Sequence, residues 1–560
     1  MPARRWISPR LVSGLVTLVC LVLTVGSLAL AGDPPSPSEP IQLEFEDDPP
    51  GIPAQPVPGA PAAETVRHAR GIQTQANVDE FGANIPGDAA NEPTIAVNRL
   101  APNHMSIAWR QFDTVNSNFR QAGWAYSTDG GRSWTFPGVL EPGVFRSDPV
   151  HDVASDGSFY YSSLMSSFLT DLWESTDEGA TWEPPSDSYG GDKQWIAVDR
   201  TGGIGDGNIY EAWSTSGSCC GNNTFTRSID GGQTFMTPIQ PPNNPVWGTM
   251  DVAADGTLYL AGVNISQRNV FYVDRSVDAQ DPALTPTFQS TTVDMGGSLV
   301  AFGGPSCPNP DGLLGQVWIA ADPSRPGYVY LLCSVDPSGT DPLDVHFSRS
   351  TDGGITWSAP FRVNDDAEHA DAWQWFGTMS VSPDGRIDAI WNDTRDTLIP
   401  NFSSLYYAYS TDGGVTWSAN ERISSFYDSH IGFPQQDKIG DYYCMVSDDV
   451  GASVAWAATF NGEEDVYFTR IGDWDCNVNG VPDSLDVTTG TSPDINGNFI
   501  PDECEALVNA VEEGGEPGAG IAVASRLLRQ NRPNPFNPRT SIAFEVPEGA
   551  GQVQLAVFDV

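Results

Sequence analysis

The sequence predicts an all-β fold, and three observations lead to that prediction. An eight-residue motif rich in Ser, Asp, Gly and Trp recurs five times along the middle of the chain, an apolar strand-like pattern recurs seven times, and the 560 residues include 56 Gly and 45 Pro. A high content of turn-forming residues suits many short strands better than helical bundles. Repetition of one unit along the chain is typical of folds in which similar sheets surround a common axis.

The first repeat, Ser-x-Asp-x-Gly-x-Thr-Trp, predicts a β-hairpin turn. Asp and Gly supply turn conformations and local side-chain-to-backbone hydrogen bonds, and the Trp packs beneath the turn. The copies lie at Ser127–Trp134, Ser175–Trp182, Ser228–Phe235, Ser350–Trp357 and Ser410–Trp417, and a degenerate copy begins at Ser276. We assign a structural role to the aspartates at their third position: Asp129, Asp177, Asp230, Asp352 and Asp412.

The second repeat, an apolar strand that ends in a small or acidic turn, precedes each hairpin. Its seven versions are Thr94–Asn98, His151–Gly157, Trp195–Asp199, Met250–Gly256, Trp318–Asp322, Thr378–Gly385 and Tyr443–Asp448. A spacing of roughly 56 residues suits a four-stranded propeller blade with its loops. The sequence therefore predicts a seven-bladed β-propeller. A six-bladed ring is the alternative, if the unit from Gln436 to Ile471 only lends strands to close it.

The hairpin motif resembles the Asp box of sialidases and other bacterial-neuraminidase-repeat propellers, over residues 81–472. The resemblance implies the propeller fold. It leaves function open, because Asp boxes are structural and occur in glycosidases, in sorting receptors and in lectin-like proteins without catalytic activity.

The N-terminal region reads as a targeting segment followed by a tether. Arg4, Arg5 and Arg10 precede an apolar run that ends in Ala29-Leu30-Ala31, which predicts a secretory signal peptide over residues 1–31. An uncleaved membrane anchor is the alternative, since about 20 apolar residues can span a bilayer. Residues 32–80 are Pro-rich and predict a disordered, semi-rigid tether. We therefore expect a secreted or cell-surface protein without stable membrane insertion after cleavage.

Residues 473–506 carry two passes of oxygen-bearing side chains at EF-hand-like spacing, which predicts bound calcium. The segment resembles the calcium-binding repeats of dockerin-like and thrombospondin-like spacer modules; an acidic linker without an ion is the alternative. The expected ligands of the first loop are Asp475, Asn477, Asn479, Val481 (through its carbonyl), Asp483 and Asp486. Those of the second are Asp494, Asn496, Asn498, Ile500 (through its carbonyl), Asp502 and Glu505.

The cysteines of the chain can form disulfides if the protein is exported, because disulfides are permitted outside the cytoplasm. Cys476 and Cys504 bracket the calcium loops and are expected to form a disulfide, and Cys307–Cys333 is a second plausible pair. Cys219 and Cys220 could form only a vicinal bond, which leaves Cys444 as a buried thiol.

After a linker over residues 507–528, residues 529–560 predict the start of a small β-sandwich. The run Arg532-Pro533-Asn534-Pro535-Phe536-Asn537-Pro538 leads into alternating strand patterns. This sequence resembles the start of the C-terminal sorting domains of secreted bacterial proteins. The resemblance implies that a bacterial secretion machine is a partner.

The charge balance excludes some partners. The chain has 72 Asp and Glu against 27 Lys and Arg, a net charge of −45. Such a surface repels polyphosphates and anionic lipids, so nucleic acid and membrane surfaces are not expected ligands.

Only two of the 27 basic residues are lysines, and both enter predicted inner strands at the propeller face opposite the hairpin turns. Charged and aromatic residues at this face predict a binding site there. The alternative is that the charged residues form inter-blade salt bridges and the Trp residues fill the blades. The candidate ligand-binding residues are Glu92, Asp192, Lys193, Trp375, Asp437 and Lys438.

Two functions remain open. Sialidase-type chemistry needs three arginines for a carboxylate, a Tyr nucleophile with a Glu, and an acid. The candidates are Arg110, Asp148, Asp393, Arg395, Tyr442 and Tyr443. Where the family has an early Arg, this chain reads Asn91-Glu92-Pro93-Thr94, so the arginine clamp is incomplete. We therefore expect a glycan- or surface-binding propeller, with an exo-acting glycoside hydrolase as the alternative.

Overall fold

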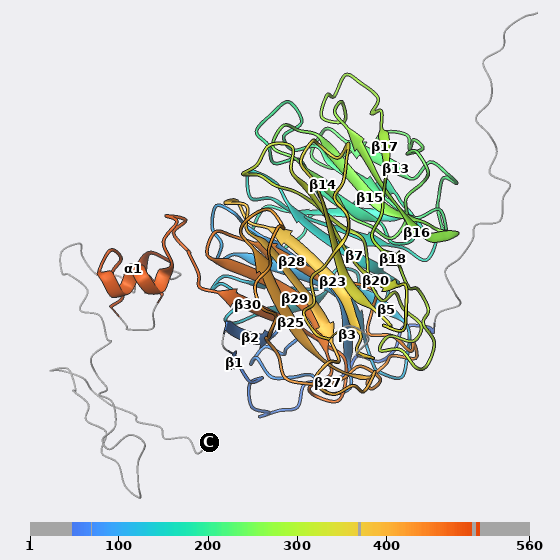
Figure 1. Cartoon of the computed structure of the whole chain (residues 1–560). Coiled ribbons are helices and arrows are strands. Elements are labelled where there is room, and N and C mark those ends of the chain that lie inside the picture. Colours follow the sequence, from blue (N-terminus) through green and yellow to red (C-terminus); the bar gives the residue numbers. More distant parts are fainter. Residues whose placement is uncertain (1–47, 69, 368–370, 496–499, 505–560) are drawn as a thin grey trace, which may run out of the picture. The chain divides into compact units, whose positions relative to one another are not determined.

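The computed structural model describes residues 48–68, 70–367, 371–495 and 500–504. Its strands form seven antiparallel sheets, the blades of a seven-bladed β-propeller, and follow one another in chain order (Figure 1). The predicted signal peptide, the first part of the tether, the linker and the predicted β-sandwich lie outside the described residues.

The first four sheets are each a short meander of neighbouring strands. Sheet one contains β3 (Ala89–Val97), β4 (Met105–Phe112), β5 (Arg120–Ser127) and β6 (Thr135–Val139). Sheet two contains β7 (Ser147–Val153), β8 (Phe159–Leu164), β9 (Thr170–Ser175) and β10 (Ser186–Tyr189). Sheet three contains β11 (Trp195–Val198), β12 (Ile209–Ala212) and β13 (Phe225–Ser228). Sheet four contains β14 (Met250–Val252), β15 (Leu258–Asn264), β16 (Gln267–Ser276) and β17 (Gln289–Val293).

The next two sheets carry an additional short strand. Sheet five contains β19 (Trp318–Ala321), β20 (Val329–Pro337), β21 (Asp344–Ser350) and β22 (Phe361–Arg362), with β18 (Gly297–Ser298) also on β20. Sheet six contains β23 (Gln374–Val381), β24 (Ile387–Asp393), β25 (Phe402–Ser410) and β26 (Glu421–Arg422), with β27 (Tyr427–Asp428) also on β25.

The seventh sheet joins the two ends of the ring. It runs from β28 (Cys444–Ser447) through β29 (Gly451–Ala458) and β30 (Asp465–Gly472) to β2 (Gly71–Gln75) and β1 (Val66–His68). The orange β30 therefore lies beside the blue β2 in Figure 1. The unit from Gln436 to Ile471 thus forms a blade of its own, which rules out the six-bladed alternative. Residues 66–68 and 71–75, which the sequence assigned to the tether before residue 81, pair in this sheet.

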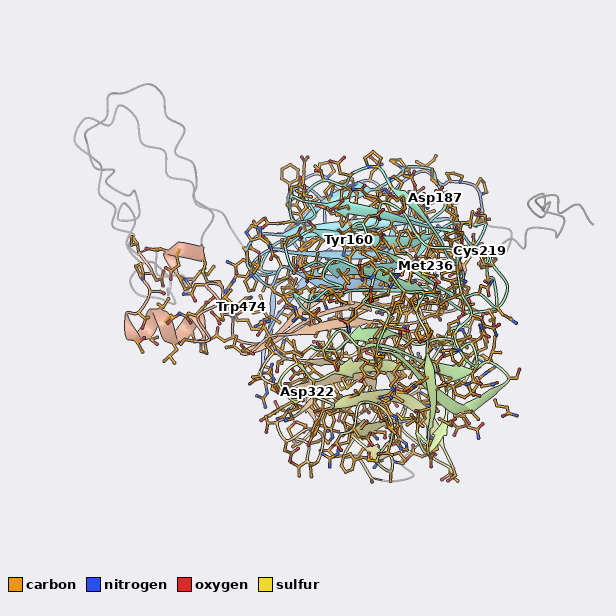
Figure 2. All side chains as sticks on the ribbon, turned by 90° about the horizontal axis from the view of Figure 1, so that it is seen from above. Tyr160, Asp187, Cys219, Met236, Asp322 and Trp474 are labelled. Carbon is orange, nitrogen blue, oxygen red and sulfur yellow. A yellow bond between two sulfur atoms is a disulfide. The ribbon has the colours of Figure 1, made fainter. Side chains whose placement is uncertain are left out.

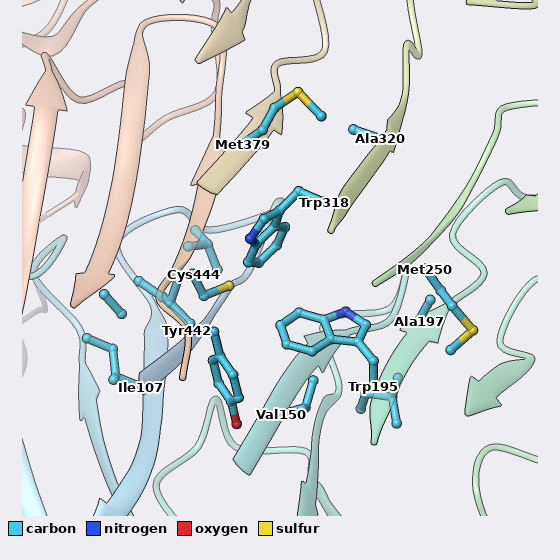
Figure 3. Packing of buried hydrophobic residues seen from close by; sticks show 14 of the residues in the cluster. Ile107, Val150, Trp195, Ala197, Met250, Trp318, Ala320, Met379, Tyr442 and Cys444 are labelled. Atoms are coloured by element: carbon cyan, nitrogen blue, oxygen red, sulfur yellow. The ribbon is translucent and has the colours of Figure 1, made fainter. Parts of the chain in front are cut away.

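The predicted inner strands are the innermost strands of all seven sheets. Their apolar side chains form one core with the strands behind them. Trp195, Trp318 and Tyr442 point toward one another in the space that the inner strands enclose (Figure 3). The ring centroid of Trp195 lies 5.2 Å from that of Trp318 and 5.6 Å from that of Tyr442, and both pairs are in edge-to-face contact. These buried aromatic rings fill the middle of the propeller.

Past the propeller, the described residues include the helix α1 (Asp483–Thr489) and the 3-10 turn η1 (Asp502–Cys504). Gly490 ends α1 in a left-handed conformation, with φ of 75°. Within the described residues, no helix combines the length and the apolar character needed to cross a bilayer.

Candidate functional site

A bulge at the start of several inner strands sets up the candidate site. Glu92, Asp148 and Lys193 have positive φ values of 52°, 45° and 55° and stand at matching places in three successive blades. The first two interrupt the strand register, between Asn91 and Thr94 in β3 and between Ser147 and Val150 in β7. Left-handed backbone at a non-glycine residue is strained, and a bulge re-aims the side chain beside it. The bulges thus turn charged side chains toward the mouth, the end of the ring where the inner strands begin.

The seventh blade has a glycine at the matching place. Gly440 has φ of 91°, and a Cβ there would lie 2.6 Å from Cγ of Glu92 and 3.0 Å from its backbone nitrogen. A side chain at residue 440 is therefore excluded by Glu92 of the first blade. This close approach brings Asp441, the next residue, next to the charged groups of the other blades.

Both lysines of the chain contact the same carboxylate. Nζ of Lys193 and Nζ of Lys438 each lie 2.6 Å from Oδ2 of Asp441. Lys193 also lies 3.3 Å from Oδ2 of Asp148. Although burial opposes it, the attraction of Lys193 and Lys438 holds the pKa of Asp441 well below its usual range. Three blades are thus tied together by one group of ion pairs.

Glu92 lies beneath the lysines and is completely buried. Its carboxylate is 3.2 Å from Nε of Arg110 and 3.7–3.8 Å from the two lysine Nζ atoms. Neither of its oxygens has a hydrogen-bond partner among the described residues. Burial raises the pKa of Glu92 to about 7, against the attraction of Arg110 and Lys193. Arg110 is also buried and donates from Nε to Oδ1 of Asn91 at 2.8 Å.

We call these six residues the mouth cluster: Glu92, Arg110, Asp148, Lys193, Lys438 and Asp441. The two lysine side chains are its most accessible members, with 12% and 15% of their surface exposed. Three formal positive and three formal negative charges balance within it. The cluster can therefore remain buried without an external ion.

Of the two candidate tyrosines, only Tyr442 adjoins this cluster. Its hydroxyl donates to the carbonyl of Pro149 at 3.1 Å, and burial together with Glu92 and Asp148 raises its pKa well above the usual value. Tyr443 points into its own blade, where its hydroxyl donates to the carbonyl of Ala457 at 2.6 Å. Both side chains are buried.

Arg395 and Asp393 belong to a separate network in the sixth blade. Arg395 Nε donates to Asp393 at 2.8 Å, its Nη1 donates to Asp365 at 2.6 Å, and its guanidinium lies 4.6 Å from the ring of Tyr406. None of these partners contacts Arg110 in the described part of the chain. The structure therefore does not bring Arg110 and Arg395 onto shared partners, as a carboxylate clamp would require.

Two ligand-binding candidates, Trp375 and Asp437, do not pair with the lysine amines. Trp375 was expected to bind ligand at the rim, but its side chain is fully buried and its Nε1 donates to Ser403, so its ring is not available to a ligand. A bulge between Trp375 and Thr378 accompanies this inward placement. Asp437 is exposed, and Lys438 pairs with Asp441 instead. The main chain of Asp192 is held by hydrogen bonds to Gly217 and Ser214.

Sequence reasoning missed Asp441, on which both lysines converge. Asp441 stands three residues after Lys438, in the same predicted rim segment. This position is the only sequence feature that could have identified it. Glu464 was also missed: it is buried near Glu92 and accepts a hydrogen bond from Asn91 at 2.6 Å.

The Asp boxes form hairpin turns as expected. In the first, Asp129 accepts hydrogen bonds from Ser127 Oγ at 2.8 Å and from the backbone nitrogen of Ser133 at 2.9 Å. The same pattern recurs at Asp177, Asp230, Asp352 and Asp412. The degenerate copy uses Asp278 with the more distant Thr287. These aspartates shape turns and lie outside the mouth cluster.

The segment expected to form the first calcium loop, residues 475–486, is closed by hydrogen bonds among its own residues. Asp475 accepts hydrogen bonds from the backbone nitrogens of Asn479 and Gly480, and Asn479 donates to Oδ2 of Asp486 at 2.7 Å. Oδ1 of Asp486 and Oδ2 of Asp483 are buried without a partner among the described residues. In the second loop, Asp502 Oδ1 accepts from the backbone of Ile495, while Asn496, Asn498 and Glu505 lie outside the described residues.

The cysteine pairs differ in part from expectation. Cys476 and Cys504 form the expected disulfide, whereas Cys307 and Cys333 are free and buried, so that second pairing is wrong. Cys219 and Cys220 form a vicinal disulfide in the loop after β12 (Figure 2). Cys444 is a buried thiol, as expected.

A cavity of about 360 Å³ opens between the inner strands toward their C-terminal ends. Arg99, Asp152, Arg200 and Asp251 line it beside apolar residues, and none of the candidate catalytic or ligand-binding residues named above does. The mouth cluster and this cavity therefore lie at different levels of the ring.

Comparison with known proteins agrees with the repeat. The profile of the BNR/Asp-box repeat matches residues 348–359 and 408–419, which contain two of the five hairpin turns. The chain is thus a seven-bladed propeller with BNR/Asp-box repeats. No curated protein matches it.

Solved structures that resemble the chain have low sequence identity. A protein of unknown function from Dyadobacter fermentans is 14% identical, with a TM-score of 0.42. The match covers 72% of this chain and 98% of the Dyadobacter protein. The endosialidase of phage phi92 is 11% identical, with 86% and 80% coverage and a TM-score of 0.38. The GH74 enzyme of Niastella koreensis is 14% identical, with 78% and 76% coverage and a TM-score of 0.35.

Proposed function

We propose that this protein is a secreted or cell-surface glycan-binding propeller whose ligand is held at the mouth by Lys193 and Lys438. The observation that carries the proposal is the convergence of both lysines on Asp441 at 2.6 Å, with their side chains the most accessible part of a buried cluster. An ammonium group held this way presents fixed donors to hydroxyl or carboxylate oxygens.

Burial of the remaining groups favours binding over hydrolysis. A catalytic acid or nucleophile must reach the substrate within hydrogen-bond distance. Glu92 and Tyr442 lie beneath the lysines and are covered, and Arg110 shares no partner with Arg395. The groups that sialidase-type chemistry would use therefore support the lysines from below.

The proposal is tested on the full chain with a glycan array followed by titration of the bound glycans. We expect Lys438→Gln to weaken binding at least about tenfold, because a charge-assisted hydrogen bond contributes roughly 1.5–3 kcal/mol. Arg275→Gln, which removes a charge from a half-buried side chain on β16 outside the mouth cluster, serves as the matched control and keeps full affinity. Unchanged binding by a folded Lys438→Gln protein would refute the proposal.

A second candidate, an exo-acting glycoside hydrolase, has one observation in its favour. The pKa of Glu92 is raised to about 7, which suits a general acid at neutral pH. A panel of fluorogenic glycosides tests it: hydrolysis that is lost in Glu92→Gln would support the hydrolase, and no turnover on any glycoside would support binding alone.

We also propose that the first spacer loop binds calcium through Asp475, Asn477, Asn479, the Val481 carbonyl, Asp483 and Asp486. The buried, unpartnered oxygens of Asp483 and Asp486 support this, since a cation would compensate both. Calcium titration of the wild-type chain against Asp486→Asn tests it. The two disulfides support an extracytoplasmic location. Export by a bacterial secretion machine through residues 529–560 is part of the same proposal.

A further inference from the structure

A second cluster of carboxylates lies where the propeller ring closes. Asp88 immediately precedes β3, the first inner strand, while Glu463 and Asp465 stand at the start of β30. The two segments are also joined by a hydrogen bond from the backbone nitrogen of Ala90 to the carbonyl of Glu464 at 2.7 Å. We call Asp88, Glu463 and Asp465 the seam cluster.

The three carboxylates are buried and crowded. Their exposed fractions are 3%, 9% and 0%, and one oxygen of each lies within 4.8 Å of the other two. Oδ1 of Asp88 is buried and has no hydrogen-bond partner among the described residues, although Oδ2 accepts from Gln111 at 2.9 Å. One acceptor of this side chain thus remains unsatisfied inside the cluster, where an unpaired buried oxygen is costly.

Every hydrogen-bond donor that surrounds the seam cluster is neutral. Asn84 and the backbone nitrogen of Gly87 donate to Glu463 at 2.9 and 2.6 Å. Asn77 and Asn461 donate to Asp465, each at 2.8 Å. Within the described residues, none of the three carboxylates forms an ion pair with a basic side chain. Burial raises the pKa of Asp465 to about 7, and repulsion from neighbouring carboxylates adds to the effect of burial on Asp88.

We propose that Asp88, Glu463 and Asp465 bind one calcium ion, which fastens the N-terminal segment of the propeller to its last strand. Carboxylate and amide oxygens are the ligands of a hard cation, and calcium binds them at 2.3–2.6 Å. Two oxygens on one calcium ion are therefore at most about 5 Å apart, and one oxygen from each of the three carboxylates meets this condition. Magnesium is less suited to a site with several protein ligands, because it demands near-ideal octahedral geometry and usually keeps several of its waters. This site is independent of the proposed glycan binding and of the spacer loop.

The experiment uses the full chain with both predicted spacer loops disabled by Asp475→Asn, Asp486→Asn, Asp494→Asn and Asp502→Asn, so that a calcium signal comes from elsewhere. After treatment with a chelator, calcium is added back while its binding is followed by isothermal titration and the propeller by thermal melting. We expect one bound calcium ion per chain and a rise in melting temperature of about 3–6 °C at saturating calcium. Magnesium at the same concentration should give a smaller rise.

Asp88→Asn, added to this background, should abolish the bound ion and the rise in melting temperature. It keeps the shape of the side chain and the acceptor for Gln111, so we expect it to fold; Glu463→Gln is the second variant. Asp79→Asn, a nearby carboxylate outside the cluster, is the matched control and should keep both signals. The proposal is overturned if the spacer-disabled chain binds no calcium, or if Asp88→Asn and Glu463→Gln respond to calcium as their parent does.

Discussion

Asp88 of the seam cluster and Glu92 of the mouth cluster are only four residues apart in the sequence. The two clusters nevertheless differ in how their buried charges are compensated. In the mouth cluster, Arg110, Lys193 and Lys438 balance three carboxylates, and the shortest contacts measure 2.6 Å. In the seam cluster, three carboxylates meet with neutral donors around them. Since both are buried, the first can be complete within the chain, whereas the second needs protons or a cation. The same degree of burial therefore has different consequences for function.

The largest expected effect comes from breaking the balance of the mouth cluster at its centre. Asp441→Asn leaves Lys193 and Lys438 without their shared carboxylate. Removing one partner of a buried ion pair costs about 3–5 kcal/mol, so the free energy of unfolding should fall by that amount in chemical denaturation.

Asp437→Asn is the matched control for that variant, because Asp437 is exposed and Lys438 does not pair with it. Its effect should stay within about 0.5 kcal/mol. If Asp441→Asn were equally mild, the ion pairs of the mouth cluster would contribute nothing to stability.

A smaller effect is expected from pH at Glu92. Its folded-state pKa of about 7 is above the usual 4.5, so the folded chain holds this proton more tightly than the unfolded chain does. The resulting contribution of Glu92 to the free energy of unfolding is present at low pH and is lost as pH rises from about 4.5 to 7. The loss amounts to up to about 3 kcal/mol. The groups that face Glu92 are Arg110, Lys193, Lys438, Asp441, Tyr442 and Glu464.

Glu92→Gln should remove this dependence. We would measure the unfolding free energy of both proteins at constant saturating calcium from pH 4.5 to 7.5. The unfolding free energy of the wild type, relative to that of Glu92→Gln, should fall as pH rises. Glu183→Gln, a change at an exposed position, should leave the pH profile of the wild-type chain unaltered. A flat difference for Glu92→Gln would mean that Glu92 is ionised throughout this range.

The fold was predictable because its signals are local and repeated. Each hairpin turn is encoded within eight residues, and each inner strand is a short apolar run, so five turns and seven strands determine the blade count. The ring closure was not predictable in this way. Gly71–Gln75 reads Gly-Ile-Gln-Thr-Gln, which lacks alternating apolar residues, and its partner β30 follows about 400 residues later.

The candidate site was predictable only in part. Placing Lys193 and Lys438 at matching positions in two blades predicted that they lie at one face, and in the structure both contact Asp441. The prediction could not identify their common partner, because Asp441 is brought in by the close approach of Gly440 to Glu92. Nor could it show that Trp375 is buried, since a bulge of one residue decides which side of a strand a side chain occupies.

The smallest expected effect separates Tyr442 from its neighbour. Tyr442→Phe removes one hydrogen bond to Pro149, and Tyr443→Phe removes one to Ala457, so each should lower the free energy of unfolding by about 1 kcal/mol. Only Tyr442 adjoins the mouth cluster. If the lysines alone contact the glycan, both variants should bind it within about twofold of wild type. A tenfold loss in Tyr442→Phe with normal binding by Tyr443→Phe would show that ligand reaches beneath the lysines, and would favour the hydrolase over the binding protein.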